Sequence, residues 1–234
     1  MRPVAAVVLC GLALAAAAVP GARAADECRG LMACISVPGP WVVVPAPATG
    51  QALSSARWQL RCPEGTVAGL DARLSDRNLD VDFGGLLGSP VTPGVTTRDR
   101  VLFTGSYTGR LRKATSFRPF IGCVAGGGGR RTPTAFKPGE PTVLRVRNVR
   151  VRPGSLVRSS LACRARERLL RSSHALGFFV RQPPTARQVA QVRSAATIAG
   201  GRILFSASRR GLDRSIGVVL QVQALCTRAP GSGP

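Results

Sequence analysis

The chain contains a single histidine, His174, and it directly follows Ser172 and Ser173. A histidine beside a hydroxyl group could act as a general base toward a nucleophile. A lone histidine is nevertheless more often a packed or surface residue than a catalytic one. We therefore predict no catalytic residue, and an extracellular hydrolase with an unrecognised site remains the alternative.

Metal and phosphate chemistry have little support in the sequence. Asp76, Asn78, Asp80 and Asp82 have the spacing of the first ligands of a calcium loop. The glycine after the third ligand is missing, and the twelfth position is Leu87 rather than glutamate. The polar face of a strand explains these residues better. No cysteines have the close spacing of a zinc site, and Gly126–Gly129 lacks the lysine and helix of a phosphate loop. We expect no metal and no cofactor.

Positive charge is the strongest compositional feature. The 33 basic and 11 acidic residues give a formal net charge of +22. Attraction to a polyanion is one interpretation. A solvated surface shaped by the codon usage of a G+C-rich genome is the other. Aromatic residues make up only 5%, which argues against stacking on nucleic-acid bases and thus against a specific nucleic-acid partner.

The stretch RVRNVRVR is one of the densest basic clusters. Its arginines alternate with valines and switch face once, at Asn148, so the stretch is either a basic strand face or a binding stripe. We predict that it binds an anionic envelope polymer or an acidic glycan through Arg145, Arg147, Arg150 and Arg152.

The first 24 residues have the pattern of a signal peptide. An apolar run from Val4 to Val19 follows Arg2, and Ala22-Arg23-Ala24 provides a small-x-small cleavage site. The run is shorter than the roughly 20 residues of a spanning helix. We predict that residues 1–24 are removed, that no transmembrane segment follows, and that the protein is secreted or associated with the cell envelope.

Six cysteines follow the predicted cleavage site, and an even number in an exported chain indicates disulfides. Two similar stretches, RVLFTGSYTG from Arg100 and RILFSASRRG from Arg202, lie 102 residues apart. Cys62 and Cys163 are 101 residues apart, and Cys123 and Cys226 are 103. The common offset predicts an internal duplication. If each repeat closes on itself, the pairs are Cys62–Cys123, Cys163–Cys226 and Cys28–Cys34.

Alternating apolar residues precede the long-range cysteines, as in half-buried strands. Together with frequent turn signals, this predicts an all-β protein of two tandem β-sandwich units, each with one core disulfide. Their size and cysteine spacing resemble immunoglobulin domains, although Trp58 precedes its cysteine instead of following it. The predicted parts are a signal peptide at 1–24, an N-terminal segment at 25–37, the first unit at 38–124, a glycine-rich linker at 125–135, the second unit at 136–226 and a disordered tail at 227–234.

One segment, TARQVAQVRSAATIAGG, fits two structures. It could form a helix capped at Thr185 and stopped at Gly200. The offset aligns it with FGGLLGSPVTPGVTT, which cannot be a helix, and a duplicated fold should keep its elements. We therefore expect strands here, with the helix as the alternative.

The motifs CPEGTVAGLDAR, GSPVTPGVTT and FRPFIGCV together resemble secreted proteins of high-G+C Gram-positive bacteria. The resemblance covers most of the chain after residue 24, and it implies export and a β-rich fold but no activity. The sequence thus predicts a non-catalytic, secreted binding protein. It does not determine the oligomeric state.

Overall fold

The computed structural model describes residues 28, 31, 33–47, 53–84, 99–109, 113–125 and 142–228. The predicted signal peptide, most of the predicted linker and most of the predicted tail lie outside these residues. In the described part, the regular structure is thirteen strands and one helix of five residues. The protein is therefore all-β, as predicted.

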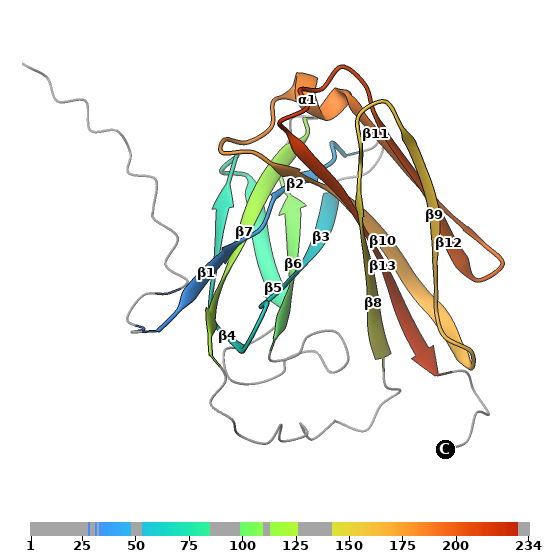
Figure 1. The fold of residues 1–234 in the computed structure, drawn as a ribbon, viewed down its shortest axis with the longest axis horizontal. Coiled ribbons are helices and arrows are strands. Elements are labelled where there is room, and N and C mark those ends of the chain that lie inside the picture. The colour runs from blue at the N-terminus through green and yellow to red at the C-terminus, as the bar shows by residue number, and fades with distance from the viewer. Residues whose placement is uncertain are drawn as a thin grey trace, which may run out of the picture.

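The strands fall into an N-terminal half, residues 33–125, and a C-terminal half, residues 142–228 (Figure 1). The N-terminal half contains β1 (Ile35–Pro38), β2 (Trp41–Val44), β3 (Ser54–Arg61), β4 (Thr66–Leu74), β5 (Leu79–Gly84), β6 (Arg100–Tyr107) and β7 (Thr115–Val124). The C-terminal half contains β8 (Thr142–Arg150), β9 (Leu156–Ala162), β10 (Glu167–Phe179), α1 (Ala186–Ala190), β11 (Val192–Ala199), β12 (Arg202–Arg209) and β13 (Gly217–Arg228).

A seven-stranded antiparallel sheet runs through both halves. In the N-terminal half, β7 pairs with β4 on one edge and with β1 and then β2 along the other. In the C-terminal half, β13 pairs with β10 and β8. Strand β2 joins the halves, because it also pairs with β10 through Val42–Gly177 and Trp41–Phe178. Strands from both halves thus belong to one hydrogen-bonded sheet.

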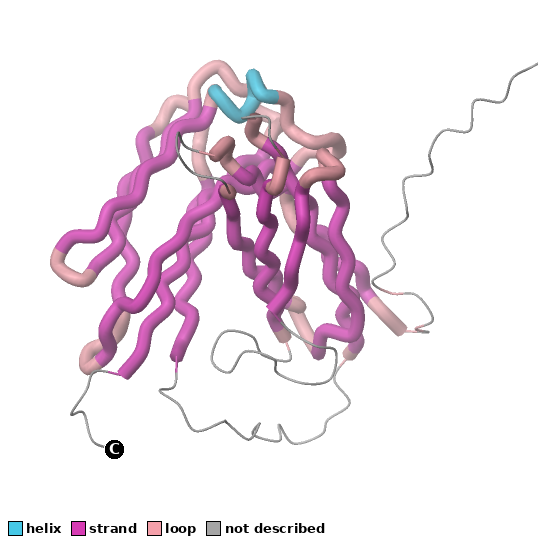
Figure 2. Tube along the Cα trace, turned by 180° about the vertical axis from the view of Figure 1, so that it is seen from behind, coloured by secondary structure: helices cyan, strands magenta, loops and turns pink. Residues whose placement is uncertain are grey.

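Two three-stranded sheets complete the molecule. The sheet β3-β6-β5 belongs to the N-terminal half, and the sheet β11-β12-β9 to the C-terminal half. In the ribbon, the two halves form two arms that meet near α1 and diverge away from it (Figures 1 and 2). Each arm has its own hydrophobic core.

The two cores interlock where β2 pairs with β10, and we call this region the joint. Trp41 and Val43 of β2 belong to the core of the C-terminal half, whereas Val42 and Val44 belong to the core of the N-terminal half. Ala175, on β10, belongs to the core of the N-terminal half. A short strand with all four side chains buried therefore serves both cores at once.

The three disulfides are Cys28–Cys34, Cys62–Cys123 and Cys163–Cys226, the pairs that the sequence predicts. In each half, the first cysteine of the long-range pair follows a strand of the small sheet, β3 or β9. The second lies on a strand of the large sheet, β7 or β13. Each bond therefore ties two layers together.

The two halves also share their strand register. Leu60 pairs with Val101 in the first small sheet, and Leu161 pairs with Ile203 in the second. These partners are offset by 101 and 102 residues. The similar stretches found in the sequence form β6 and β12, and each is the middle strand of its small sheet.

A bulge recurs at the core cysteine of each half. In the N-terminal half, the register between β4 and β7 shifts between Val67 and Gly69, and Val67 pairs with Cys123. In the C-terminal half, the register between β10 and β13 shifts between Leu169 and Arg171, and Leu169 pairs with Cys226. In each half, a bulge therefore bends the strand that pairs with the core cysteine, β4 or β10.

The segment from Thr185 to Gly201 corrects the expectation that it contains only strands. Thr185 begins a capping box with Gln188, and α1 occupies one turn before β11 takes over at Val192. Strand β11 pairs with β12 as β5 pairs with β6, with Val192 opposite Arg209 and Leu79 opposite Tyr107. The capping box therefore stabilises one helical turn, and pairing with β12 determines the structure of the residues beyond it.

Candidate functional site

A contact between the halves forms where the edge strand β3 meets the outer face of β13. The Gln221 side chain accepts a hydrogen bond from Gln59 N at 2.7 Å and donates to Gln59 O at 3.1 Å. Gln223 donates to the backbone oxygen of Arg57 at 3.3 Å. These two amides take the place of a neighbouring strand and satisfy the free edge of β3.

Both glutamines are buried, with exposed fractions of 0% for Gln221 and 2% for Gln223. Gln221 also donates to Asn148 Oδ1 at 2.9 Å and accepts from Gln223 Nε2 at 2.7 Å. Ser173 donates to Gln223 Oε1 at 3.1 Å. A connected amide network therefore holds the two halves at one fixed spacing.

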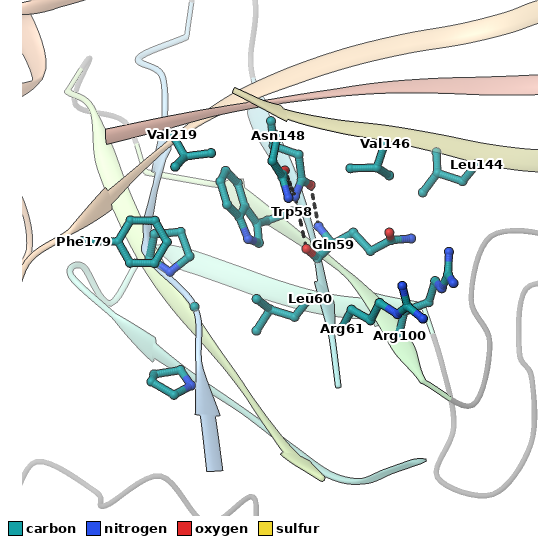
Figure 3. Close-up of a pocket in the computed structure, with 14 residues that line it drawn as sticks. Trp58, Gln59, Leu60, Arg61, Arg100, Leu144, Val146, Asn148, Phe179 and Val219 are labelled. Atoms are coloured by element: carbon teal, nitrogen blue, oxygen red, sulfur yellow. Dashed lines mark hydrogen bonds between the residues drawn. The ribbon is translucent and has the colours of Figure 1, made fainter. Parts of the chain in front are cut away.

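A groove of about 480 Å³ lies beside this network, and we call it the inter-half groove. Leu144, Val146 and Asn148 of β8 line one side of it, and Arg61 and Arg100 lie across from them (Figure 3). Phe179, Val219 and Trp58 line the end near the joint. The remaining lining residues are Pro38, Gly39, Pro40, Gln59, Leu60 and Gln221.

Two arginines at this groove share one carboxylate. Arg61 Nε donates to Asp99 Oδ2 at 2.8 Å, and Arg100 Nε donates to Asp99 Oδ1 at 3.3 Å. The Arg61 side chain is 65% exposed, and that of Arg100 is 33% exposed. One acidic group therefore holds two guanidinium groups side by side and leaves one positive charge in excess.

Three of the four arginines predicted as a binding face lie on β8, where they are divided between its two faces, and the fourth follows the strand. Arg145 and Arg147 pair with Ala224 and Val222, so they share the face of the core. Arg150 pairs with Val219 and therefore lies on the same face as Asn148 and the inter-half groove. Arg152 is exposed in the loop beyond β8.

Arg145 and Arg147 already have partners within the C-terminal half. Arg145 forms an ion pair with Glu167, with Nη2 at 2.5 Å from Oε1 and Nε at 3.0 Å from Oε2. This pair lowers the pKa of the Glu167 carboxyl, with a further contribution from the Arg164 N–H. Arg147 donates to Ser159 Oγ and to Ser160 O.

Three loops of the C-terminal half meet around Arg209, which is buried and donates to Ile216 O. Gly154 N donates to Arg209 O, and Arg210 N donates to Gln191 O. Six exposed arginines lie on these loops, on α1 and on the adjoining end of β8. We call this set the arginine rim: Arg150, Arg152, Arg181, Arg187, Arg210 and Arg214.

Positive charge is concentrated in the C-terminal half. Residues 142–228 contain 17 arginines and two acidic residues, whereas residues 33–125 contain ten basic and six acidic residues. The formal net charges are therefore +15 and +4. Of the two acidic groups in the C-terminal half, Glu167 is paired with Arg145, and Asp213 accepts from Ser215 N and Oγ.

His174 lies at an exposed position on β10, opposite Val222. Partial desolvation lowers its pKa. Among the described residues, no carboxylate forms an ion pair with it, and the neighbouring Ser173 hydroxyl donates to Gln223 instead.

The acidic run that resembles a calcium loop serves local structure. Asp76 pairs with Lys113 and also accepts from Asn78 N, and these hydrogen bonds lower the pKa of its carboxyl. Asp80 and Asp82 lie on exposed positions of β5. Cys163, Cys226 and Glu167 bring ligand atoms within 4.8 Å of one another, but the two sulfur atoms are joined in a disulfide. In the described part of the chain, no helix is long and apolar enough to cross a membrane.

Comparisons with protein-family models, curated proteins and solved structures found no match to this chain.

Sequence reasoning missed the joint, the amide network that binds β3 to β13, and the groove beside that network. Gln221 and Gln223 stand out only as polar residues on the outer face of an apolar strand. The partner of that face, the edge of β3, lies about 160 residues away in sequence. The four-residue apolar run of β2 is a signal that could have indicated the joint, because a strand without alternation is typically buried on both faces.

Proposed function

We propose that this protein is a secreted or cell-envelope protein that binds an anionic polymer and catalyses no reaction. Its scaffold would be two duplicated β-sandwich units of immunoglobulin-like architecture. The arginine rim carries the proposal, because its six exposed arginines, on adjoining loops, α1 and the end of β8, have only Asp213 as an acidic neighbour within those segments. Such a surface attracts polyanions through its summed potential.

The number and chemistry of the rim side chains favour a ligand with repeated anionic groups. Guanidinium groups bind carboxylates and phosphates through paired N–H donors, and they remain charged at every physiological pH. Asp213 is engaged by Ser215, whose backbone and side-chain hydrogen bonds lower the pKa of its carboxyl. The rim therefore keeps a net positive charge after its internal contacts are counted.

The duplication is supported by features that repeat in both halves. These are the registers of the small sheets, the bulge beside the core cysteine and the layer-to-layer disulfide. Export is supported by the three disulfides, since such bonds persist in oxidising compartments. An extracellular location would place the rim among envelope polymers, many of which are acidic.

Binding to immobilised polyphosphate and polygalacturonate over a salt series tests this function, with neutral dextran as the reference polymer. The rim variant is Arg152→Gln, Arg187→Gln and Arg210→Gln. The matched control, with the same loss of charge, is Arg164→Gln, Arg166→Gln and Arg202→Gln, three exposed residues at the other end of the C-terminal half.

We expect wild type to bind either polyanion and to release it steeply as salt rises, because counterion release dominates such binding. The rim variant should bind at least about tenfold more weakly with a flatter salt slope, and the control should change by less than about threefold. Equal losses in both variants, or no binding by wild type at physiological salt, would contradict the proposal.

A further inference from the structure

We infer that the inter-half groove binds an acidic saccharide, a sugar ring that carries a carboxylate or another anionic substituent. The assignment rests on the proposed function, because it identifies where one unit of an anionic polymer would sit. None of the residues that line the groove belongs to the arginine rim, although Arg150 of the rim lies on the same face of β8. The inference rests on the shape of the groove, its neutral donors and its arginine pair.

The groove has the size and the mixed lining of a ligand site. Its volume of about 480 Å³ falls within the range of roughly 300–1,000 Å³ that is typical of small-molecule pockets. Phe179 is 50% exposed and lies with Val219 on one side of the Asn148–Gln221 pair, and Val146 and Leu144 add apolar surface on the other side. This surface suits the C–H face of a sugar ring.

Fixed amides supply the neutral hydrogen-bonding groups. Both ends of the Gln221 side chain form hydrogen bonds within the amide network, so this side chain cannot turn toward a ligand. It holds Asn148 in place instead. Asn148 accepts from Gln221 through Oδ1, which leaves its NH₂ end as the donor for another group. An amide held in one orientation is suited to a sugar hydroxyl.

The arginine pair selects for charge. Asp99 occupies the Nε side of Arg61 and of Arg100, and a guanidinium carries five N–H donors in all. The outer N–H groups of the two arginines can therefore donate hydrogen bonds to one further anion, which would neutralise the remaining positive charge. A neutral sugar would leave that charge without a partner.

An acyl chain fits the same groove less well. Gln59, Gln221 and Asn148 line the groove together with its apolar residues, and a hydrocarbon would cover these amides without replacing water on them. A sugar offers hydroxyl groups at the corresponding places. The combination of apolar, amide and guanidinium groups therefore favours an acidic sugar over a lipid.

Titration of the full protein with trigalacturonate, followed by NMR or calorimetry, tests the site. Its methyl ester is the matched neutral ligand. We expect trigalacturonate to bind at least about tenfold more tightly than the ester, because charge-assisted hydrogen bonds to arginine are lost with the carboxylates. Arg61→Gln with Arg100→Gln should remove this preference, whereas Arg164→Gln with Arg166→Gln should leave it unchanged.

A second variant keeps the test decisive if loss of both arginines impairs folding around Asp99. Leu144→Trp fills the groove from β8 and leaves the arginine pair in place, and it should abolish trigalacturonate binding. Equal binding of acid and ester, no binding at all, or unchanged binding by Leu144→Trp would overturn the site. If the rim still binds polyanions in that case, the proposed function stands without it. If trigalacturonate binds the groove but the rim variant binds polymers like wild type, the site stands, and the part of the proposed function that places polymer binding on the rim fails.

Discussion

The two halves have similar arrangements of sheets, registers and disulfides, yet they use the corresponding outer face of the large sheet in different ways. Gln221 and Gln223 lie five and three residues before Cys226, and Arg118 and Phe120 lie five and three before Cys123. In the C-terminal half, the glutamines bind the edge of β3. In the N-terminal half, the Arg73 and Arg118 guanidinium groups lie 5.2 and 5.3 Å from the centre of the Phe120 ring. The face in the C-terminal half contacts a neighbouring sheet, whereas the corresponding face in the N-terminal half is covered by its own arginine side chains.

The strands at the joint differ in the same sense. Strand β10 extends to Phe179 and pairs with β2 through Gly177 and Phe178, whereas the corresponding strand β4 ends at Leu74. At the other end of the large sheet, β8 pairs only with β13 and carries three arginines. Charged side chains discourage pairing at an edge strand. A shortened strand at one end and a basic edge at the other therefore explain why the sheet stops after two halves.

Removal of a core disulfide should have the largest effect, and an equal one in the two halves. The two bonds close loops with sequence separations of 61 and 63 residues. Each should contribute about 4 kcal/mol by restricting the unfolded chain. Cys62→Ala with Cys123→Ala, and Cys163→Ala with Cys226→Ala, should each lower the free energy of unfolding by about that amount in denaturant titrations.

Both variants should still unfold in a single transition, because the large sheet runs through both halves. Calorimetry with intact and variant proteins measures this directly. Two resolved transitions, with only the one of the altered half shifted, would mean that the halves fold independently despite the shared sheet.

The second largest effect separates the two outer faces. Gln221→Leu removes the side-chain partners of the Gln59 N–H and C=O groups in the buried amide network. We therefore expect the free energy of unfolding to fall by about 3 kcal/mol. Arg118→Leu, at the corresponding position, removes a hydrogen bond to Gly39 O and should cost about 1 kcal/mol. Urea unfolding of both variants checks the ratio. Equal losses would show that the amide network adds nothing to the stability of the face.

A third test addresses the close approach of the halves at Gly177. A Cβ atom there would lie 2.5 Å from Pro40 Cγ and 2.7 Å from Trp58 Cη2, so Gly177→Ala should cost about 1–3 kcal/mol. Gly105→Ala is the control, because its Cβ would meet Phe117 within the N-terminal core. Only Gly177→Ala should speed amide exchange across the β2–β10 pairs, and equal exchange in both variants would argue against a tight joint.

The features that could be predicted from the sequence are those with short-range signals. Alternation before Cys62 and Cys226 predicts strands, and the similar spacing of the cysteines in the two halves predicts their pairing. Both signals are local or depend on a simple offset, so they need no knowledge of how the sheets assemble.

The segment around α1 shows why a constant offset can mislead. Leu79 and Val192 occupy equivalent places beside β6 and β12, yet they are 113 residues apart rather than 102. The C-terminal half has a longer connection before this strand, and the N-terminal half has a longer one after it. The two differences cancel by the time β6 and β12 begin, and the ungapped alignment therefore conceals both.

The candidate site depends on contacts that no local pattern encodes. Arg61 and Arg100 face Asn148 and Val146 only because β3 docks on β13. The predicted stripe from Arg145 to Arg152 divides instead between the core face, the groove face and a loop. Its alternation indicated a strand correctly, but the partner of each face was set by tertiary packing.

The smallest effect concerns the basic edge strand of the C-terminal half. Glu167 binds Arg145 of β8 and the backbone N–H of Arg164, and these contacts lower the pKa of its carboxyl below the ordinary value of 4.5. A lowered pKa in the folded state means that the contribution to stability is complete well above pH 4.5 and is lost as the pH falls through the folded-state value. Glu167→Gln should therefore cost about 1 kcal/mol or less at pH 7, and the difference from wild type should shrink below pH 4.5. Urea unfolding at pH 7, pH 4.5 and lower values measures this dependence, and high salt at pH 7 should reduce the same difference. A difference that stays constant with both pH and salt would mean that Glu167 acts through packing, and that β8 needs no ion pair to hold its edge position.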